Sequence, residues 1–142
     1  MSDAPDLTDP RQVLSRTLYG EARGQGQSAI EAVCSIILNR ARNPRWWGKS
    51  IVDVCLKPYQ FSCWLEDDPN HAKLLAVTDA DAAFQECLAV ADLALGGTLP
   101  DATGNCDSYF DISIPPPSWA RGKTPTLVLG SLRFYRLELA AP

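Results

Sequence analysis

The spacing of apolar and polar residues predicts helices over roughly the first two thirds of the 142-residue chain. Asp9 can cap a helix, Pro10 suits its first position, and Gln12 completes a capping-box pattern. Ser28 with Glu31 gives a second start, followed by apolar residues at i, i+3, i+4 and i+7. Glycine and proline residues then mark where the predicted helices end. Helices are expected over residues 9–23, 28–43, 50–57 and from 78 or 79 to 95.

The last third of the chain has a different pattern. Five prolines fall between residues 100 and 125, and helical periodicity is weak. Two short apolar runs, 127–129 and 132–135, flank Gly130-Ser131, which is a typical hairpin turn. The pattern predicts an α+β fold that is mainly helical, with a small C-terminal β-hairpin. We expect a flexible tail over residues 1–8 and a single domain over residues 9–142.

Composition and charge narrow the function. The chain is 46% hydrophobic and 21% charged, as is usual for a globular protein. Its net charge of −4 and pI near 4.9 argue against a nucleic-acid partner, since such binding depends on basic side chains. Arg40, Arg42 and Arg45 form a basic cluster, interpreted as a solvated helix end rather than a polymer site. No segment has the length of a membrane span, and a monomer is expected.

The cysteines and the lone histidine exclude several chemistries. Five cysteines, an odd number without a C-x-x-C pair, predict free thiols made in a reducing compartment. The acidic start of the chain has no apolar signal core, so synthesis in the cytoplasm is expected. His71 is the only histidine. It is expected to face solvent, and neither a zinc amidase nor a Cys-His peptidase is favoured. No metal or cofactor is expected.

Glu21 is the candidate for catalysis. In the first helix it follows Leu14 by seven residues and Leu18 by three, so its carboxyl lies on the face that turns to the core. Desolvation there favours the protonated form, which a general acid needs. The alternative is a surface Glu21 near a helix end, paired with Arg23 or another base.

An aromatic and polar loop follows the third predicted helix. Gln60, Phe61, Ser62 and Trp64 offer amide, hydroxyl and ring groups close together. Sugars need this mixture, because their hydroxyls require hydrogen bonds and their ring faces stack on aromatic rings. Phe61 and Trp64 could instead be core residues beneath a turn.

Three further side chains are weaker candidates. Tyr109 and Tyr135 could bind substrate or could be core tyrosines. Asn39 lies within a predicted helix, where asparagine is a poor helix former, and a scaffold role is favoured for it over direct contact with the site.

At these motifs the chain resembles the SleB-type cell-wall hydrolases, a family of spore-cortex-lytic enzymes and phage endolysins. The resemblance covers about residues 11 to 136 and is carried by segments 18–26, 32–40, 60–64, 119–120 and 130–135. It implies a lysozyme-like fold and cleavage of the β-1,4 bond between N-acetylmuramic acid and N-acetylglucosamine in peptidoglycan. It also implies that Glu21 is the catalytic acid. One position departs from the family, since Ser108 stands where relatives often have histidine.

Three functions remain open at the level of sequence. A lytic transglycosylase, which is favoured, needs only Glu21, because the C6 hydroxyl of the muramic acid attacks C1 and leaves a 1,6-anhydro product. A hydrolytic muramidase needs a second carboxylate roughly 5 to 9.5 Å away, for which Asp107 and Asp111 are the candidates. A peptidoglycan-binding module would use the groove without chemistry. The expected biology is that of a phage endolysin, held in the host cytoplasm until it is released to the cell wall.

Overall fold

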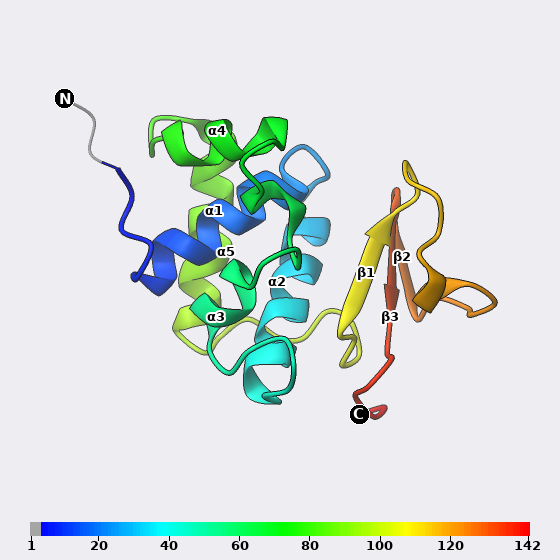
Figure 1. Ribbon diagram of the computed structural model, residues 1–142. Helices are drawn as coiled ribbons and strands as arrows, with labels where there is room; N and C mark the ends of the chain where they lie inside the picture. Colours follow the sequence, from blue (N-terminus) through cyan, green and yellow to red (C-terminus); the bar gives the residue numbers. More distant parts are fainter. Residues whose placement is uncertain (1–3) are drawn as a thin grey trace.

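The computed structural model describes residues 4–142 and has a helical part beside a small sheet (Figure 1). Five α-helices precede three strands, and two short 3-10 helices lie at Ser62–Trp64 and Ser118–Ala120. The predicted α+β, mainly helical fold is confirmed. The elements are α1 (Pro10–Ala22), α2 (Gln27–Arg42), α3 (Ile51–Leu56), α4 (Pro69–Ala76), α5 (Ala82–Leu95), β1 (Ser108–Asp111), β2 (Leu127–Leu129) and β3 (Leu132–Tyr135).

Helix α1 is the centre of the helical part and packs against the other four helices. It begins as predicted, because the Asp9 carboxylate accepts from the backbone N–H of Arg11 and Pro10 is the first helical residue. The capping box is not closed, since the Gln12 amide oxygen accepts from Arg16 instead. Every residue from 13 to 19 is buried, so α1 is covered on all sides and not only on its apolar face.

Helix α2 ends at Asn43, its C-cap, as predicted, but its start differs from the predicted Ser28 cap. It begins at Gln27, after Gly26 in a left-handed conformation with φ of 97°, and no side chain caps it. At the other end Arg40 is buried, whereas Arg42 and Arg45 are exposed. The interpretation of all three arginines as a solvated helix end is therefore wrong for Arg40. Its guanidinium lies over the rings of Trp47 and Phe61, 5.6 and 5.7 Å from their centroids.

Helix α4 was not predicted. Asp68 caps it by accepting from the N–H of Asn70, and Pro69 is its first residue. At its C-terminal end, Nη1 of the buried Arg16 donates to the carbonyl oxygens of Leu74 and Val77. Those carbonyls lack helical partners, so Arg16 holds α4 against α1.

The prediction that His71 faces solvent is wrong. His71 lies on α4, where it is half-buried with its ring edge toward Trp64, at 6.4 Å between centroids.

The sheet contains the predicted hairpin and one further strand. β2 and β3 pair around Gly130-Ser131, as expected. β1 pairs with the other edge of β3, which places Tyr109 opposite Phe134 and gives the order β1-β3-β2. β1 precedes β3 by more than twenty residues, so local pattern alone did not show this pairing. It places Tyr109 at the boundary between the sheet and the helices.

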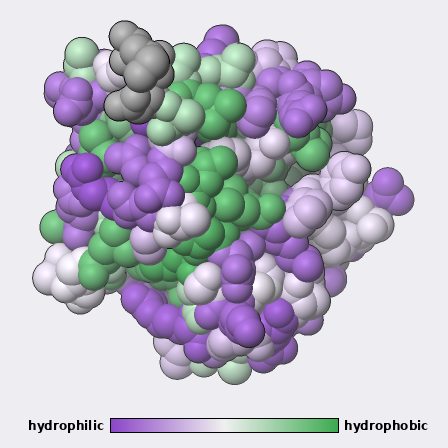
Figure 2. Space-filling view, turned by 60° about the vertical axis from the view of Figure 1, so that its left-hand side comes forward, coloured by the Kyte–Doolittle hydropathy of each residue, from purple (hydrophilic) through white to green (hydrophobic). Residues whose placement is uncertain are grey.

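The core and surface agree with most of the remaining expectations. All five cysteines are free, as predicted, and all are buried. Burial raises the pKa of the Cys34, Cys55 and Cys87 thiols to about 12. Within residues 4–142, no helix is both long enough and apolar enough to cross a membrane. Figure 2 shows an apolar area framed by polar groups on the face that carries the N-terminal segment.

The predicted flexible tail begins with residues 1–3, which lie outside the described part of the chain. Within the rest of the predicted tail, Asp6 accepts hydrogen bonds from both the backbone N–H and the hydroxyl of Thr8.

Candidate active site

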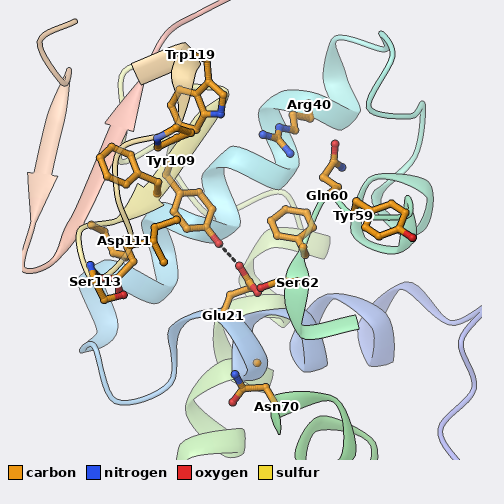
Figure 3. Close-up of a pocket in the computed structure, with 16 residues that line it drawn as sticks. Glu21, Arg40, Tyr59, Gln60, Ser62, Asn70, Tyr109, Asp111, Ser113 and Trp119 are labelled. Atoms are coloured by element: carbon orange, nitrogen blue, oxygen red, sulfur yellow. Dashed lines mark hydrogen bonds between the residues drawn. The ribbon is translucent and has the colours of Figure 1, made fainter. Parts of the chain in front are cut away.

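A cavity of about 480 Å³ opens between the helical part and the sheet. Figure 3 shows Glu21 at its base, with Tyr109 and Trp119 on the sheet side and Tyr59 and Gln60 on the helical side. This volume is within the usual range for small-ligand sites. The cavity therefore brings together side chains from the end of α1, from the 59–62 loop and from β1.

Glu21 lies in the last turn of α1 and is half-buried. Its Oε1 accepts a hydrogen bond from the Tyr109 hydroxyl at 2.6 Å, and its Oε2 is 3.4 Å from the backbone nitrogen of Cys63. The carbonyl end of a helix carries partial negative charge, so a carboxylate there depends on such donors. The shorter bond holds Oε1 and leaves Oε2 more weakly bound. Glu21 is thus oriented so that one oxygen can exchange a proton with a ligand in the cavity.

Gly20 sets the distance between α1 and the 61–64 loop. A Cβ atom at this position would lie 2.7 Å from Cβ and 2.8 Å from Sγ of Cys63. Real Cβ atoms do not approach so closely, so only glycine lets the loop reach α1. The close approach brings the Cys63 N–H beside Glu21.

Tyr109 is held by packing on one side and by Glu21 on the other. Its ring stacks on Phe134, with centroids 5.6 Å apart and planes inclined by 29°. Burial, and then the neighbouring Glu21 carboxylate, raise the pKa of the Tyr109 hydroxyl well above its ordinary value. Tyr109 therefore remains a neutral donor to Glu21 at neutral pH.

Arg40 is a buried cation in the cavity wall. Its Nε donates to the carbonyl oxygen of Asp107 at 2.7 Å, which ties α2 to the start of β1. Burial lowers the pKa of the guanidinium below its ordinary value. Within residues 4–142, two buried side-chain polar atoms have no hydrogen-bond partner, namely Nη1 of Arg40 and Oε1 of Gln60. Both residues line the cavity, so its wall contains an unpaired donor and an unpaired acceptor.

The residues predicted for substrate binding separate into two groups. Gln60, Phe61, Ser62 and Tyr109 line the cavity with Glu21. The Gln60 amide nitrogen also donates to the carbonyl oxygens of Trp47 and Val54, so its position is fixed by the scaffold.

Trp64 and Tyr135 are outside the set of lining residues. The Trp64 indole N–H donates to the Thr17 hydroxyl at 2.9 Å, on the side of α1. Tyr135 is buried and stacks on Phe110, with Trp119 edge-on at 5.5 Å. These two side chains support the cavity wall from behind.

The two candidate second carboxylates have different environments. Asp107 is fully buried and accepts hydrogen bonds from the backbone N–H groups of Leu137, Glu138 and Leu139 and from the Ser108 hydroxyl. It lies outside the cavity and anchors the backbone that follows β3. This placement disfavours Asp107 as a reacting group.

Asp111 lines the same cavity as Glu21. Burial acts to raise its pKa, but donors from the Ser113 backbone and the Ser131 hydroxyl outweigh this effect and lower it below the ordinary value. Asp111 is therefore ionised at neutral pH.

Ten of the sixteen lining residues were not predicted as site residues, and among them are Arg40, Tyr59, Asn70 and Trp119. Tyr59 directly precedes the loop that was singled out, and its aromatic character was the available signal. Arg40 was assigned to the surface because a guanidinium above apolar rings has no local sequence signature. Asn39 is a scaffold residue, as favoured, because its amide donates to Cys106 and Asp101. In the described chain, no group of three or more His, Cys, Asp or Glu could hold a metal ion.

Comparisons with known proteins identify the family and the fold. The family model described as Cell Wall Hydrolase matches residues 24–135, so the match begins three residues after Glu21. The catalytic domain of the Bacillus cereus SleB protein has a similar fold, with a TM-score of 0.65 and 22% identity over 88% of each chain. The catalytic domain of the germination-specific lytic transglycosylase SleB from Bacillus anthracis matches equally, covering 88% of this chain and 92% of that one. No curated protein sequence matches the chain.

Proposed function

The chain belongs to the cell wall hydrolase family, and we propose that it cleaves the β-1,4 bond between N-acetylmuramic acid and N-acetylglucosamine in peptidoglycan, with Glu21 as the general acid. One observation carries the proposal. Glu21 lies at the base of a cavity and is held by Tyr109 through one carboxyl oxygen only. The cavity wall supplies aromatic and polar groups, which sugar rings require.

The reaction begins with proton transfer from Glu21. Because the Tyr109 hydroxyl donates to Oε1, the proton of the acid is carried on Oε2. Oε2 gives it to the glycosidic oxygen while the C1–O bond breaks and the muramic acid ring gains oxocarbenium character. The leaving sugar departs as a neutral alcohol, and Glu21 becomes a carboxylate that can act as a base.

We favour the lytic transglycosylase route for the second half of the reaction. The Glu21 carboxylate takes the proton of the C6 hydroxyl of the same muramic acid, and the C6 oxygen bonds to C1. This closes a 1,6-anhydro ring, returns the acid to its starting form and consumes no water. The route needs one carboxylate, and it is supported by the similar Bacillus anthracis protein, which is a lytic transglycosylase.

The second candidate is a hydrolytic muramidase in which Asp111 acts with Glu21. It is favoured by one observation, namely that Asp111 lines the same cavity and has a lowered pKa. An ionised carboxylate there could stabilise the oxocarbenium ion or activate a water molecule. Asp111→Asn separates the routes, because the muramidase loses most of its turnover, whereas the transglycosylase keeps it.

The test of the function compares the wild-type protein with Glu21→Gln on purified sacculi. Clearing of turbidity is expected to fall by about a factor of 1000 or more with binding to sacculi retained, since the amide cannot supply the proton. Mass spectrometry of the wild-type products then separates the routes, and reducing-end muramic acid without anhydro sugar would overturn the transglycosylase. Full clearing by Glu21→Gln would overturn Glu21 as the general acid, and binding without clearing by the wild type would leave only a role in wall binding.

In its biology we propose that the protein is an endolysin, made in the cytoplasm of an infected host and released to the wall at lysis. The five free, buried thiols are consistent with synthesis in a reducing compartment. Cell fractionation during infection tests this proposal. Protein found outside the inner membrane before any membrane lesion would contradict it.

A further inference from the structure

A second cavity of about 540 Å³ adjoins the first on the side away from Glu21. The two cavities share part of their lining, so one open groove runs from Glu21 past this shared wall. Beyond it the second cavity is lined by Trp46, Lys57, Leu137 and Glu138, among others. The shared residues are Arg40, Tyr59, Gln60, Tyr109 and Trp119.

Tyr59 stands at the rim of both cavities in an unusual conformation. Its φ is 66°, in the left-handed region that strains an aromatic residue, and 84% of its surface is exposed. Core packing does not offset that strain, because the Tyr59 ring makes little contact with the rest of the protein. Strain without a structural benefit is typical of a functional position.

Trp46 provides a second exposed aromatic surface in the same cavity. Its indole N–H donates to the Glu138 carboxylate at 2.7 Å, and its ring leans on Trp47 with centroids 5.5 Å apart. These contacts fix the orientation of Trp46 while 60% of its surface stays exposed. Two aromatic side chains are thus presented to solvent beside a charged Lys57 and Glu138.

We propose that this second cavity is a saccharide subsite that binds the next sugar of the glycan strand, with Tyr59 as its stacking residue. The inference rests on the proposed function and deepens it by naming where the strand runs. Two open aromatic faces suit a pyranose ring, whose apolar face stacks on them, and the Glu138 carboxylate already accepts from the Trp46 indole.

The decisive variant is Tyr59→Gly, because it is expected to weaken sugar binding without lowering the melting temperature of the protein. Glycine adopts a φ of 66° without strain, so the melting temperature is expected to stay equal or rise. Loss of the ring is expected to weaken binding of a peptide-free N-acetylglucosamine pentasaccharide by about 5-fold. Binding is measured by calorimetry in the Glu21→Gln background, where the ligand is not cleaved.

The matched control is Leu93→Ala, which removes an exposed apolar side chain of α5 that lines neither cavity. It is expected to leave affinity unchanged. In the background with Glu21 intact, Tyr59→Gly is expected to raise KM for glycan strands with kcat retained, because the contact between Glu21 and Tyr109 is untouched.

Unchanged pentasaccharide affinity in Tyr59→Gly would overturn the subsite. A loss confined to peptide-bearing sacculi, with the pentasaccharide unaffected, would also overturn it, because the cavity would then bind the stem peptide. Failure of the proposed function is seen separately, as cleavage that persists in Glu21→Gln.

Discussion

Replacing Tyr109 by phenylalanine tests the assigned role of Glu21 most directly. The change removes the hydroxyl that donates to Glu21 Oε1 at 2.6 Å and keeps the ring that stacks on Phe134. A hydrogen bond to a charged group contributes about 1.5 to 3 kcal/mol, and the half-buried position favours the lower end, so about 1.5 kcal/mol is expected to be lost. That free energy corresponds to about a 10-fold change in rate.

Turnover is expected to fall by about 10-fold across the pH range, because the carboxyl is less well positioned. The assay is turbidity clearing of sacculi between pH 4 and 10. Tyr135→Phe is the control, because Tyr135 is buried behind the cavity, and its profile is expected to match the wild type.

Stability gives an independent readout of the same contact. The raised pKa of Tyr109 means that its contribution is fully present below the unfolded value of about 10 and is lost as pH rises through the folded value. The wild type is therefore expected to lose its advantage over Tyr109→Phe above about pH 10 in urea unfolding. Unchanged turnover in Tyr109→Phe would refute the reasoning that Tyr109 orients Glu21.

Three further predictions concern the support of the site. Gly20→Ala forces Cys63 away from α1, so the free energy of unfolding is expected to fall by about 1 to 3 kcal/mol. Activity is expected to fall as well. An unchanged melting temperature would contradict this. Asp107→Asn is expected to destabilise the fold by about 2 to 4 kcal/mol, as measured by urea unfolding, while the folded fraction keeps its turnover. A selective loss of kcat would instead make Asp107 a reacting group. The buried thiols are expected to resist a disulfide reagent at pH 8 and to react fully, five per chain, in denaturant; fast native reaction would refute their burial.

Local chemistry made part of the candidate site predictable. Glu21 was found from helical spacing and from its neighbouring motifs, and the 60–62 segment from its mixture of aromatic, amide and hydroxyl groups. Both signals are short-range, because helix period and composition are visible within a few turns. Asp107 and Asp111 show where such signals end. Two aspartates four residues apart look alike in sequence, yet one accepts three backbone N–H groups in the interior and the other lines the cavity.

Arg40 and Tyr59 show why the rest was hidden. Arg40 reads as a solvated helix end, and only the packing of Trp47 and Phe61 around its guanidinium makes it a buried wall residue. Tyr59 reads as an ordinary loop aromatic, because backbone strain and exposure do not appear in a sequence. Both properties arise from residues that meet in space, so no local pattern could reveal them.

The sequence by itself determined the helices α1, α2, α3 and α5, the C-terminal hairpin and the candidate acid, because caps, glycine stops and apolar periodicity act locally. Only the tertiary structure decided what Glu21 touches. The pairing of β1 with β3 brings Tyr109 to Glu21 across 88 residues of chain, and Gly20 lets the Cys63 backbone approach from another direction. Long-range contacts of this kind depend on the packing of the whole chain, and they give a glutamate on a helix a fixed position in the cavity.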